Sequence, residues 1–179
     1  MNKAQALQKI STKIKRCLIC RKDSIGLPVV GEGDPDAKIV FIGEAPGKTE
    51  SLTGRPFVGR SGKFLRAQLK TIGLDEKNVY ITSPVKYLPK QGTPTPQQIA
   101  HGRTHLDEQL AVINPAVIVL MGRVAAEAVL GEYLAISKLH GQTIKKDNKI
   151  YFISYHPAAA LRFDRKTFIQ DFKKIRKLI

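Results

Sequence analysis

Short apolar runs alternate with amphipathic segments along this chain. Four apolar runs have the length and composition of buried strands: 37–42, 79–82, 116–121 and 150–154. Segments with apolar residues at helical spacing flank these runs: 3–16, 62–72, 96–113, 124–130 and a final one after Asp164. Strands that alternate with helices form a parallel sheet covered on both faces, so the pattern predicts an α/β fold.

Capping and turn residues indicate where some of these elements end. Thr95, followed by Pro96 and Gln98, has the pattern of a capping box, so a helix should begin at Pro96. Asp147-Asn148 predicts the turn of a hairpin over 142–153. The length of 179 residues suits one core, and no repeat or linker divides the chain, so we expect a single domain over residues 1–179.

The charge balance suggests a class of partner. Thirty Lys and Arg against fifteen Asp and Glu give a formal net charge of +15. So large an excess favours a polyanion such as nucleic acid, whereas the alternative explanation is a bias for solubility or habitat. No run is long enough to span a membrane and the basic N-terminus has no apolar signal segment, so we expect a cytoplasmic, nucleoid-associated protein. Nothing in the pattern predicts an oligomer, and we expect a monomer.

A loop rich in glycine and proline follows the first apolar run. It extends from Gly43 to Gly62 and contains Glu44 and Phe57. Open α/β sheets place ligand sites at such strand ends. The spacing G-x-x-x-G-K-T is one residue too short for a phosphate-binding P-loop, and the charge of Glu44 would repel a phosphate. The loop therefore suits a flat, uncharged ring; the structural alternative is a tight strand-to-helix connection with a packed Phe57.

A histidine follows the last apolar run. The segment Tyr155-His156-Pro157 comes directly after 150–154, so His156 should reach the same sheet edge as Glu44. A lone histidine is more often structural. Two polar residues at the carboxyl ends of separate parallel strands, however, form a candidate catalytic pair.

Three segments resemble the motifs of family 4 uracil-DNA glycosylases: GEAPGKTESLTGRPFVGRSGKFL at 43–65, VYITSPVK at 79–86 and SYHPAAALR at 154–162. The similarity continues through CLIC at 17–20 and GEGDPDAKIVFIG at 31–43, and so spans nearly the whole chain in order. It implies a three-layer α/β/α sandwich around a four-stranded, mostly parallel sheet. It also implies a monofunctional glycosylase that flips uracil out of single- or double-stranded DNA, hydrolyses its N-glycosidic bond and leaves an abasic site, the first step of base excision repair.

The resemblance also implies roles for individual residues. Glu44 would position or activate the attacking water, or offset the positive charge that develops on the sugar. His156 would hydrogen-bond the uracil oxygen as negative charge accumulates on the base. The flipped base would stack on Phe57 and contact Gly43, Ala45 and Ser83. The residues expected to contact DNA are Arg55, Arg60, Lys86 and two wedge candidates, Leu161 and Arg162, although some of the basic side chains could equally be solvated.

Ser83 departs from the family pattern, which has asparagine at this position. An amide presents a donor and an acceptor together and so matches the adjacent carbonyl and N–H of uracil, whereas a hydroxyl is shorter and carries one proton. Two alternatives therefore stay open. One is a glycosylase with altered base specificity, and the other is a member that binds DNA without cleaving it.

The cysteines are the second departure. The family supplies four cysteines to an iron–sulfur cluster, but Tyr87 and Gly102 occupy two of these positions here, so a complete 4Fe–4S cluster is not expected. Two histidines, one helical turn apart, lie beside the missing fourth ligand. The resulting Cys2His2 set, suited to tetrahedral zinc, is Cys17, Cys20, His101 and His105. The alternative is a lost cluster that leaves two free thiols and two surface histidines. The glycosylase chemistry itself needs no cofactor.

Overall fold

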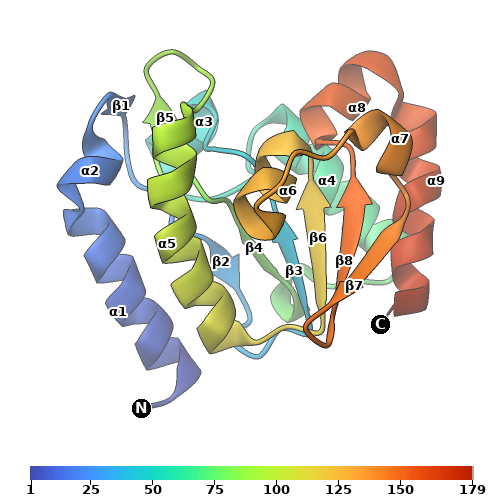
Figure 1. The fold of residues 1–179 in the computed structure, drawn as a ribbon, viewed down its shortest axis with the longest axis horizontal. Coiled ribbons are helices and arrows are strands. Elements are labelled where there is room, and N and C mark those ends of the chain that lie inside the picture. Colours follow the sequence, from blue (N-terminus) through green and yellow to red (C-terminus); the bar gives the residue numbers. More distant parts are fainter. Residues whose placement is uncertain (179) are drawn as a thin grey trace.

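A computed structural model describes residues 1–178, whose main sheet has six strands in the order β2-β4-β3-β6-β8-β7 (Figure 1). The four inner strands run parallel to one another: β4 (Tyr80–Thr82), β3 (Ile39–Ile42), β6 (Val117–Met121) and β8 (Lys149–Ser154). The two edge strands pair antiparallel with their neighbours: β2 (Glu32–Gly33) with β4 and β7 (Thr143–Lys146) with β8. The α/β class and the mostly parallel sheet are thus confirmed.

The predicted number of four strands is wrong, because the two edge strands extend the sheet to six. β7 is the first arm of the predicted hairpin, and its turn residues Asp147 and Asn148 have φ values of 51° and 58°, as a tight hairpin turn requires. β2 has only two residues and no apolar alternation, so the sequence carries no signal for it. A separate two-stranded ribbon joins β1 (Ser24–Ile25) to β5 (Leu88–Pro89).

Helices cover both faces of the sheet. The described helices are α1 (Lys3–Arg16), α2 (Leu18–Arg21), α3 (Lys48–Thr53), α4 (Arg60–Thr71), α5 (Pro96–Ile113), α6 (Arg123–Leu130), α7 (Ile136–Leu139), α8 (Pro157–Phe163) and α9 (Arg165–Ile175), with short 3-10 turns at Glu76–Asn78 and Arg176–Leu178. In residues 1–178, no helix is both long and apolar enough to cross a bilayer.

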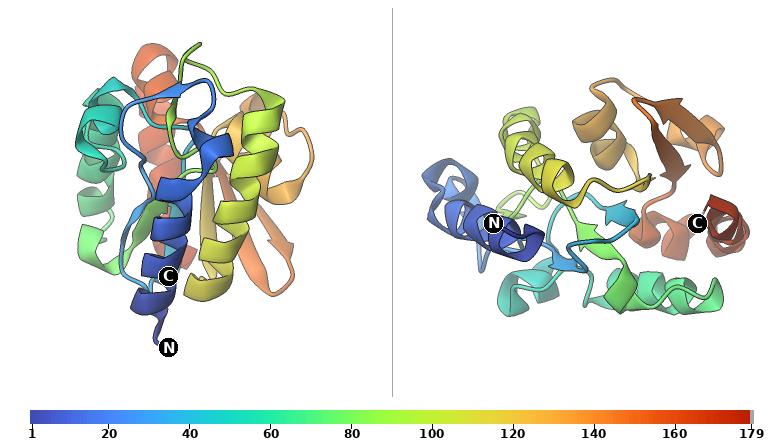
Figure 2. Two further views of the ribbon diagram at one scale, coloured as in Figure 1. Left: turned by 90° about the vertical axis from the view of Figure 1, so that its left-hand side faces the viewer. Right: turned by 90° about the horizontal axis from the view of Figure 1, so that it is seen from below.

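Alternate side chains of the inner strands build one core on each face of the sheet. Phe41 and Val119 pack with apolar residues of α4 and α9 on one face. Val40 and Leu120 pack with α1, α5 and α6 on the other. Figure 2 shows the result from below, with α1 and α5 on one side of the sheet and α4 on the other. The three-layer α/β/α arrangement follows from strands that are apolar on both faces.

The predicted capping residues begin the helices where the sequence places them. Thr95 accepts a hydrogen bond from the backbone of Gln98 at 3.2 Å, and the Gln98 side chain accepts one from the backbone of Thr95 at 3.0 Å. This reciprocal pair starts α5 at Pro96. Asp164 caps α9 through the backbone N–H of Thr167 at 2.9 Å. Both helices thereby acquire a fixed start near the carboxyl edge of the sheet.

Candidate active site

The carboxyl ends of the parallel strands bring the predicted site residues to one edge of the sheet. β4 ends at Thr82 and leads into Ser83, while the adjacent β3 ends at Ile42 and leads into Gly43 and Glu44. The backbone N–H of Gly43 donates to the Thr82 carbonyl at 2.9 Å, which continues the register of the two strands to this edge.

The other half of the edge is formed by β6 and β8. Gly122 follows β6, and its N–H donates to the Ser154 carbonyl at the end of β8 at 2.9 Å. Gly122 has φ +92°, and a Cβ on it would lie 3.1 Å from Cβ of His156. A glycine here therefore lets His156 approach the end of β6 closely. His156 reaches the edge that carries Glu44, as the chain order predicts.

Phe57 lies over the start of the opening loop. A Cβ on Gly43 would fall 2.5 Å from Cζ of Phe57, so the ring covers the face of Gly43 that has no side chain. The Phe57 and His156 rings are 6.0 Å apart between centroids and tilted by 35°. An apolar ring and an imidazole thus lie close together, although they are 99 residues apart in the sequence.

His156 presents a neutral imidazole at pH 7. Burial lowers the pKa of His156 to about 4. Its Nδ1 accepts a hydrogen bond from the backbone N–H of Ala158 at 3.2 Å. Because Nδ1 is the acceptor, we assign the single ring proton to Nε2. The side chain can therefore donate one hydrogen bond to a ligand without first losing or gaining a proton.

Glu44 is a partly buried carboxyl group. Burial raises the pKa of Glu44 above its ordinary value of 4.5, and the charge of Arg123 opposes this effect. Arg123 begins α6 directly after Gly122, and it also pairs with Glu127 at 2.8 Å. Arg123 is not among the residues predicted from the sequence, where its only signal is its place after a buried strand. A partly buried carboxylate can orient a water molecule or stabilise a positive charge.

Ser83 is buried, with 6% of its surface exposed. Its hydroxyl donates to the carbonyl oxygen of Val85 at 2.8 Å. The one proton of Ser83 is thus already used within the protein, and only lone pairs remain for a ligand. Ala45 packs against the small apolar cluster that includes Val85 and Val124, so it supports the loop from beneath.

Three of the predicted DNA contacts line a groove of about 270 Å³ beside the site. They are Arg60, Leu161 and Arg162, and Lys48 and Ser61 share the groove with them. Leu161 also packs on the core through part of its side chain.

Arg55 and Lys86 are placed differently. The guanidinium of Arg55 is exposed but forms two bonds with Glu32, at 2.9 and 3.1 Å. Lys86 is only 1% exposed, and its Nζ donates to Thr82 Oγ1 at 2.9 Å and to Gln109 Oε1 at 2.6 Å. The predicted contact of Lys86 with DNA is therefore wrong. The side chain turns inward because acceptors on β4 and α5 satisfy its amino group, and burial lowers the pKa of Lys86 to about 7.

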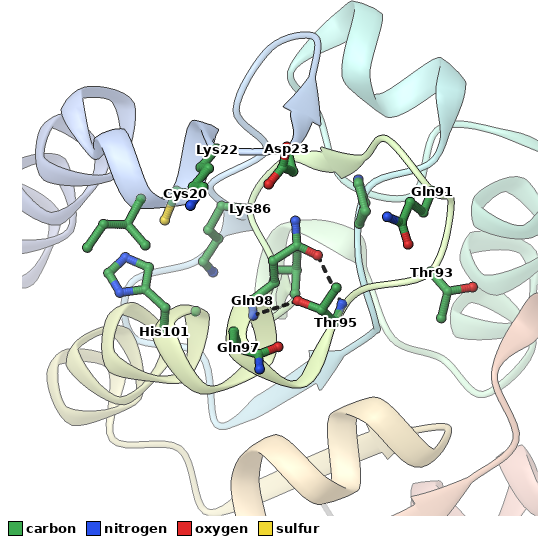
Figure 3. Close-up of a pocket in the computed structure, with 14 residues that line it drawn as sticks. Cys20, Lys22, Asp23, Lys86, Gln91, Thr93, Thr95, Gln97, Gln98 and His101 are labelled. Carbon is green, nitrogen blue, oxygen red and sulfur yellow. Dashed lines mark hydrogen bonds between the residues drawn. The ribbon is translucent and has the colours of Figure 1, made fainter.

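Four metal-ligating side chains converge at one end of the molecule, as predicted: Cys17, Cys20, His101 and His105. One ligand atom from each lies within 4.8 Å of all the others, and Cys17 Sγ lies 3.1 Å from His101 Nε2. Packing of α1 against α5 brings the two pairs together. Figure 3 shows Cys20 and His101 facing each other at one end of a pocket of about 310 Å³.

The surroundings of His105 support a metal site at this group. It is 2% exposed, and neither ring nitrogen has a hydrogen-bond partner among the described residues. Buried polar groups are normally satisfied, so an unpaired imidazole beside two thiols fits a metal ligand. Two Zn–S bonds and two Zn–N bonds in a tetrahedron place the ligand atoms roughly 3.4–3.8 Å apart, and this range falls within the 4.8 Å limit that holds for all four ligand atoms here.

A 4Fe–4S cluster does not fit these residues. A cubane binds each ligand to a different iron, which spreads the ligand atoms more widely than one metal ion does. Tyr87, at the third cysteine position, is 4% exposed, and its hydroxyl points to the Lys15 carbonyl at 3.5 Å. At the fourth position, a Cβ on Gly102 would lie 2.3 Å from the Pro84 carbonyl oxygen, so the backbone there leaves no room for a ligand side chain.

Comparisons with known proteins agree with this geometry. The family model described as "Uracil DNA glycosylase superfamily" matches residues 30–179. The chain is 39% identical to the Type-4 uracil-DNA glycosylase of Sulfurisphaera tokodaii, over 97% of this chain and 84% of that protein. It is 37% identical to the Type-4 uracil-DNA glycosylase of Archaeoglobus fulgidus, over 96% and 94% respectively, and 35% identical to that of Thermotoga maritima, over 98% and 95%. The chain therefore belongs to the uracil-DNA glycosylase superfamily.

Proposed function

We propose that this protein is a monofunctional uracil-DNA glycosylase that excises uracil, the deaminated form of cytosine, as the first step of base excision repair. The observation that carries the proposal is that Glu44 and His156 follow the carboxyl ends of two parallel strands at one sheet edge, with the Phe57 ring 6.0 Å from His156, in a chain of this superfamily. In the reaction, a water oxygen bonds to C1′ of the sugar. The C1′–N1 bond breaks, its electron pair goes to the base, and the water proton ends on the released uracil.

Each of the three side chains supplies one element of this reaction. Phe57 gives the flipped base a flat apolar surface on which to stack. The Nε2–H of neutral His156 donates to the uracil carbonyl oxygen that gains negative charge, as an oxyanion-hole donor does. The Glu44 carboxylate orients the attacking water and stabilises the positive charge on the sugar. No lysine nucleophile is required, so the DNA strand stays intact at the abasic site.

The groove beside the site would hold the DNA backbone. Arg60 and Arg162 provide positive charge there for the phosphates. Leu161 is the candidate that fills the gap left by the flipped nucleotide. We propose that the protein acts as a monomer on single- and double-stranded DNA.

Ser83 favours a second candidate function, a glycosylase with wider base specificity. Because its proton is donated to Val85, Ser83 can only accept a hydrogen bond from a base. Uracil offers such an N–H at N3, and hypoxanthine, a deaminated purine, offers one at N1, whereas the corresponding nitrogen of cytosine is an acceptor. An acceptor alone therefore separates uracil from cytosine, but it does not separate uracil from thymine, which has the same N3–H, and it reads fewer features than an amide.

A panel of oligonucleotides tests both candidates. Strands with a single uracil, hypoxanthine, cytosine or thymine are incubated with the protein, and alkali then cleaves any abasic site. We expect cleavage at uracil and none at cytosine. Release of hypoxanthine that Ser83→Asn abolishes, while uracil release increases, would establish the wider specificity. Binding of the uracil strand without cleavage would overturn the enzymatic proposal in favour of a binding-only member.

We further propose that the Cys2His2 group holds a structural zinc ion. The convergence of four ligand atoms and the unpaired nitrogens of His105 support this assignment. Bound zinc would cross-link Cys17 and α2 to α5, where the cluster of the related enzymes is expected. No step of base release involves this metal.

A further inference from the structure

Phe57 adopts a backbone conformation that bulky residues rarely take. Its φ is +51°, in the left-handed region, and it lies in the loop between α3 and α4. A side chain with a Cβ is strained there and persists only where the surrounding structure holds it.

The peptide groups on both sides of Phe57 are bonded to charged side chains. Glu50 Oε1 accepts from the backbone N–H groups of Val58 at 2.8 Å and Gly59 at 2.7 Å. Arg66 donates from Nε to the Phe57 carbonyl at 2.9 Å and from Nη2 to the Pro56 carbonyl at 2.8 Å. These four bonds fix the chain immediately before and after the aromatic residue.

Burial and ion pairs hold the side chains of Glu50 and Arg66 in place. Glu50 is only 9% exposed. The Arg66 side chain is 13% exposed, and its guanidinium also pairs with Glu32 at 2.5 Å and with Glu76. Two carboxylates thus neutralise Arg66 and hold the plane of its guanidinium toward the two carbonyl groups. Arg66 is accordingly not one of the basic residues that offer free charge to DNA.

The first turn of α4 lies directly against the same backbone. A Cβ on Gly62 would fall 2.0 Å from the carbonyl carbon of Phe57. The absence of a side chain at Gly62 lets Arg66, one turn later on α4, reach the carbonyl groups of Pro56 and Phe57. The loop is therefore held against α4 on one side and against Glu50 of α3 on the other.

We infer that Glu50 and Arg66 are positioning residues for base recognition, which hold Phe57 in its left-handed conformation so that its ring covers Gly43 beside His156. The inference rests on the proposed function, because the ring needs this position only if a flipped base stacks on it. When either side chain is lost, the backbone relaxes and the ring leaves its place, while Glu44 and His156 stay on their strand ends. Base binding then weakens before the chemical step does.

A double-mutant cycle tests this inference through activity. Arg66→Lys keeps the charge but loses the forked pair of bonds, and we expect it to lower kcat/KM on a uracil oligonucleotide by roughly tenfold, mainly through KM. In a Phe57→Ala background the same substitution should change kcat/KM by less than about twofold, because no ring remains to be positioned. Lys70→Ala, on the exposed side of the same helix, is the control and should leave kcat/KM unchanged in both backgrounds.

Substitutions of Glu50 test the inference independently of Arg66. Glu50→Ala should lower kcat/KM, and Glu50→Gln should restore most of it, because the amide oxygen still accepts from Val58 and Gly59. The chain contains no tryptophan, so Phe57→Trp creates a single fluorescent reporter at the platform. Adding Arg66→Lys to Phe57→Trp should shift the emission to the red as the ring becomes solvated, and adding Lys70→Ala should not.

The outcomes separate the two levels of the proposal. If Phe57→Ala leaves uracil release unchanged, the proposed site itself is wrong. If Phe57→Ala slows release, the double mutants decide. Arg66→Lys and Glu50→Ala overturn the inference if each slows release by the same factor in the wild-type and Phe57→Ala backgrounds, because these residues then only stabilise the fold. An unchanged tryptophan emission in the Arg66→Lys background overturns it as well.

Discussion

The Phe57 and His156 rings lie 6.0 Å apart between their centroids, tilted by 35°, at the carboxyl edge of the sheet. One ring is apolar and held in a strained loop, and the other is a neutral hydrogen-bond donor that follows the last parallel strand. In the proposed reaction, they would offer a flipped base a surface for its face and a hydrogen-bond partner for its edge. Glu44 follows β3, which β6 separates from β8, and in the proposed reaction it would act on the side of the sugar.

The pH dependence of base release should have an acid limb and no step near neutrality. The pKa of Glu44 is raised above 4.5, so acidification protonates this carboxylate earlier than usual and the rate should fall. His156, with a pKa of about 4, stays neutral through the whole neutral range. Single-turnover rates between about pH 4.5 and 8.5 check this. A rate that increases as the pH falls from 7 to 6 would contradict this and show that base release requires a protonated histidine.

Glu44→Gln should stabilise the protein at neutral pH. Because folding raises the pKa of Glu44, the charged carboxylate opposes folding above the ordinary pKa and not below it. An uncharged amide removes this cost, and we expect a melting temperature higher by about 2 °C at pH 7. The exposed Glu132→Gln serves as the control and should not change the melting temperature. An increase for Glu44→Gln that persists unchanged at pH 4 would contradict the electrostatic explanation.

Purified protein should contain about one zinc ion per chain and no acid-labile sulfide. Elemental analysis measures the metal directly, and a chelator should lower the melting temperature. Cys20→Ser and His105→Ala should each lose the zinc while the rate of base release, measured below the melting temperature, stays near the wild-type value. Stoichiometric iron together with sulfide would contradict the Cys2His2 zinc assignment.

Arg60, Arg162 and Lys86 should differ in their effect on DNA binding. Arg60→Ala and Arg162→Ala should each weaken DNA binding and reduce its salt slope by about 1, because each removes one phosphate contact. Lys86→Ala should leave the salt slope unchanged but lower the free energy of unfolding by about 1–3 kcal/mol, since buried acceptors lose their donor. A reduced salt slope for Lys86→Ala would show that Lys86 does contact DNA.

The inner strands and α5 could be predicted because their signals are local. Buried parallel strands are continuous apolar runs, and the Thr95 capping box marks the start of α5 by itself. The edge strand β2 has two residues and takes its structure from pairing with β4, which no local pattern records. The inward turn of Lys86 also depends on tertiary partners, since Gln109 lies on a different element.

In the candidate site, too, some features follow from the sequence and others arise only from tertiary packing. Chain order places Glu44 and His156 at one edge because parallel strands share the direction of their carboxyl ends. The left-handed backbone of Phe57 and its bonds to Glu50 and Arg66 arise only when α3 and α4 pack around the loop. Likewise, the cysteine and histidine pairs are each visible in the sequence, but only the packing of α1 on α5 joins them.

Release of uracil by the Glu44 and His156 variants tests the central claim most directly. The wild-type protein should convert a uracil-containing oligonucleotide to an alkali-labile product. Glu44→Gln should slow release by roughly 10²–10⁴-fold, and His156→Ala should slow it by roughly 10²–10³-fold. Affinity for the same DNA should change by less than about threefold in both, because the phosphate contacts remain. Wild-type rates of uracil release in both variants would contradict the account.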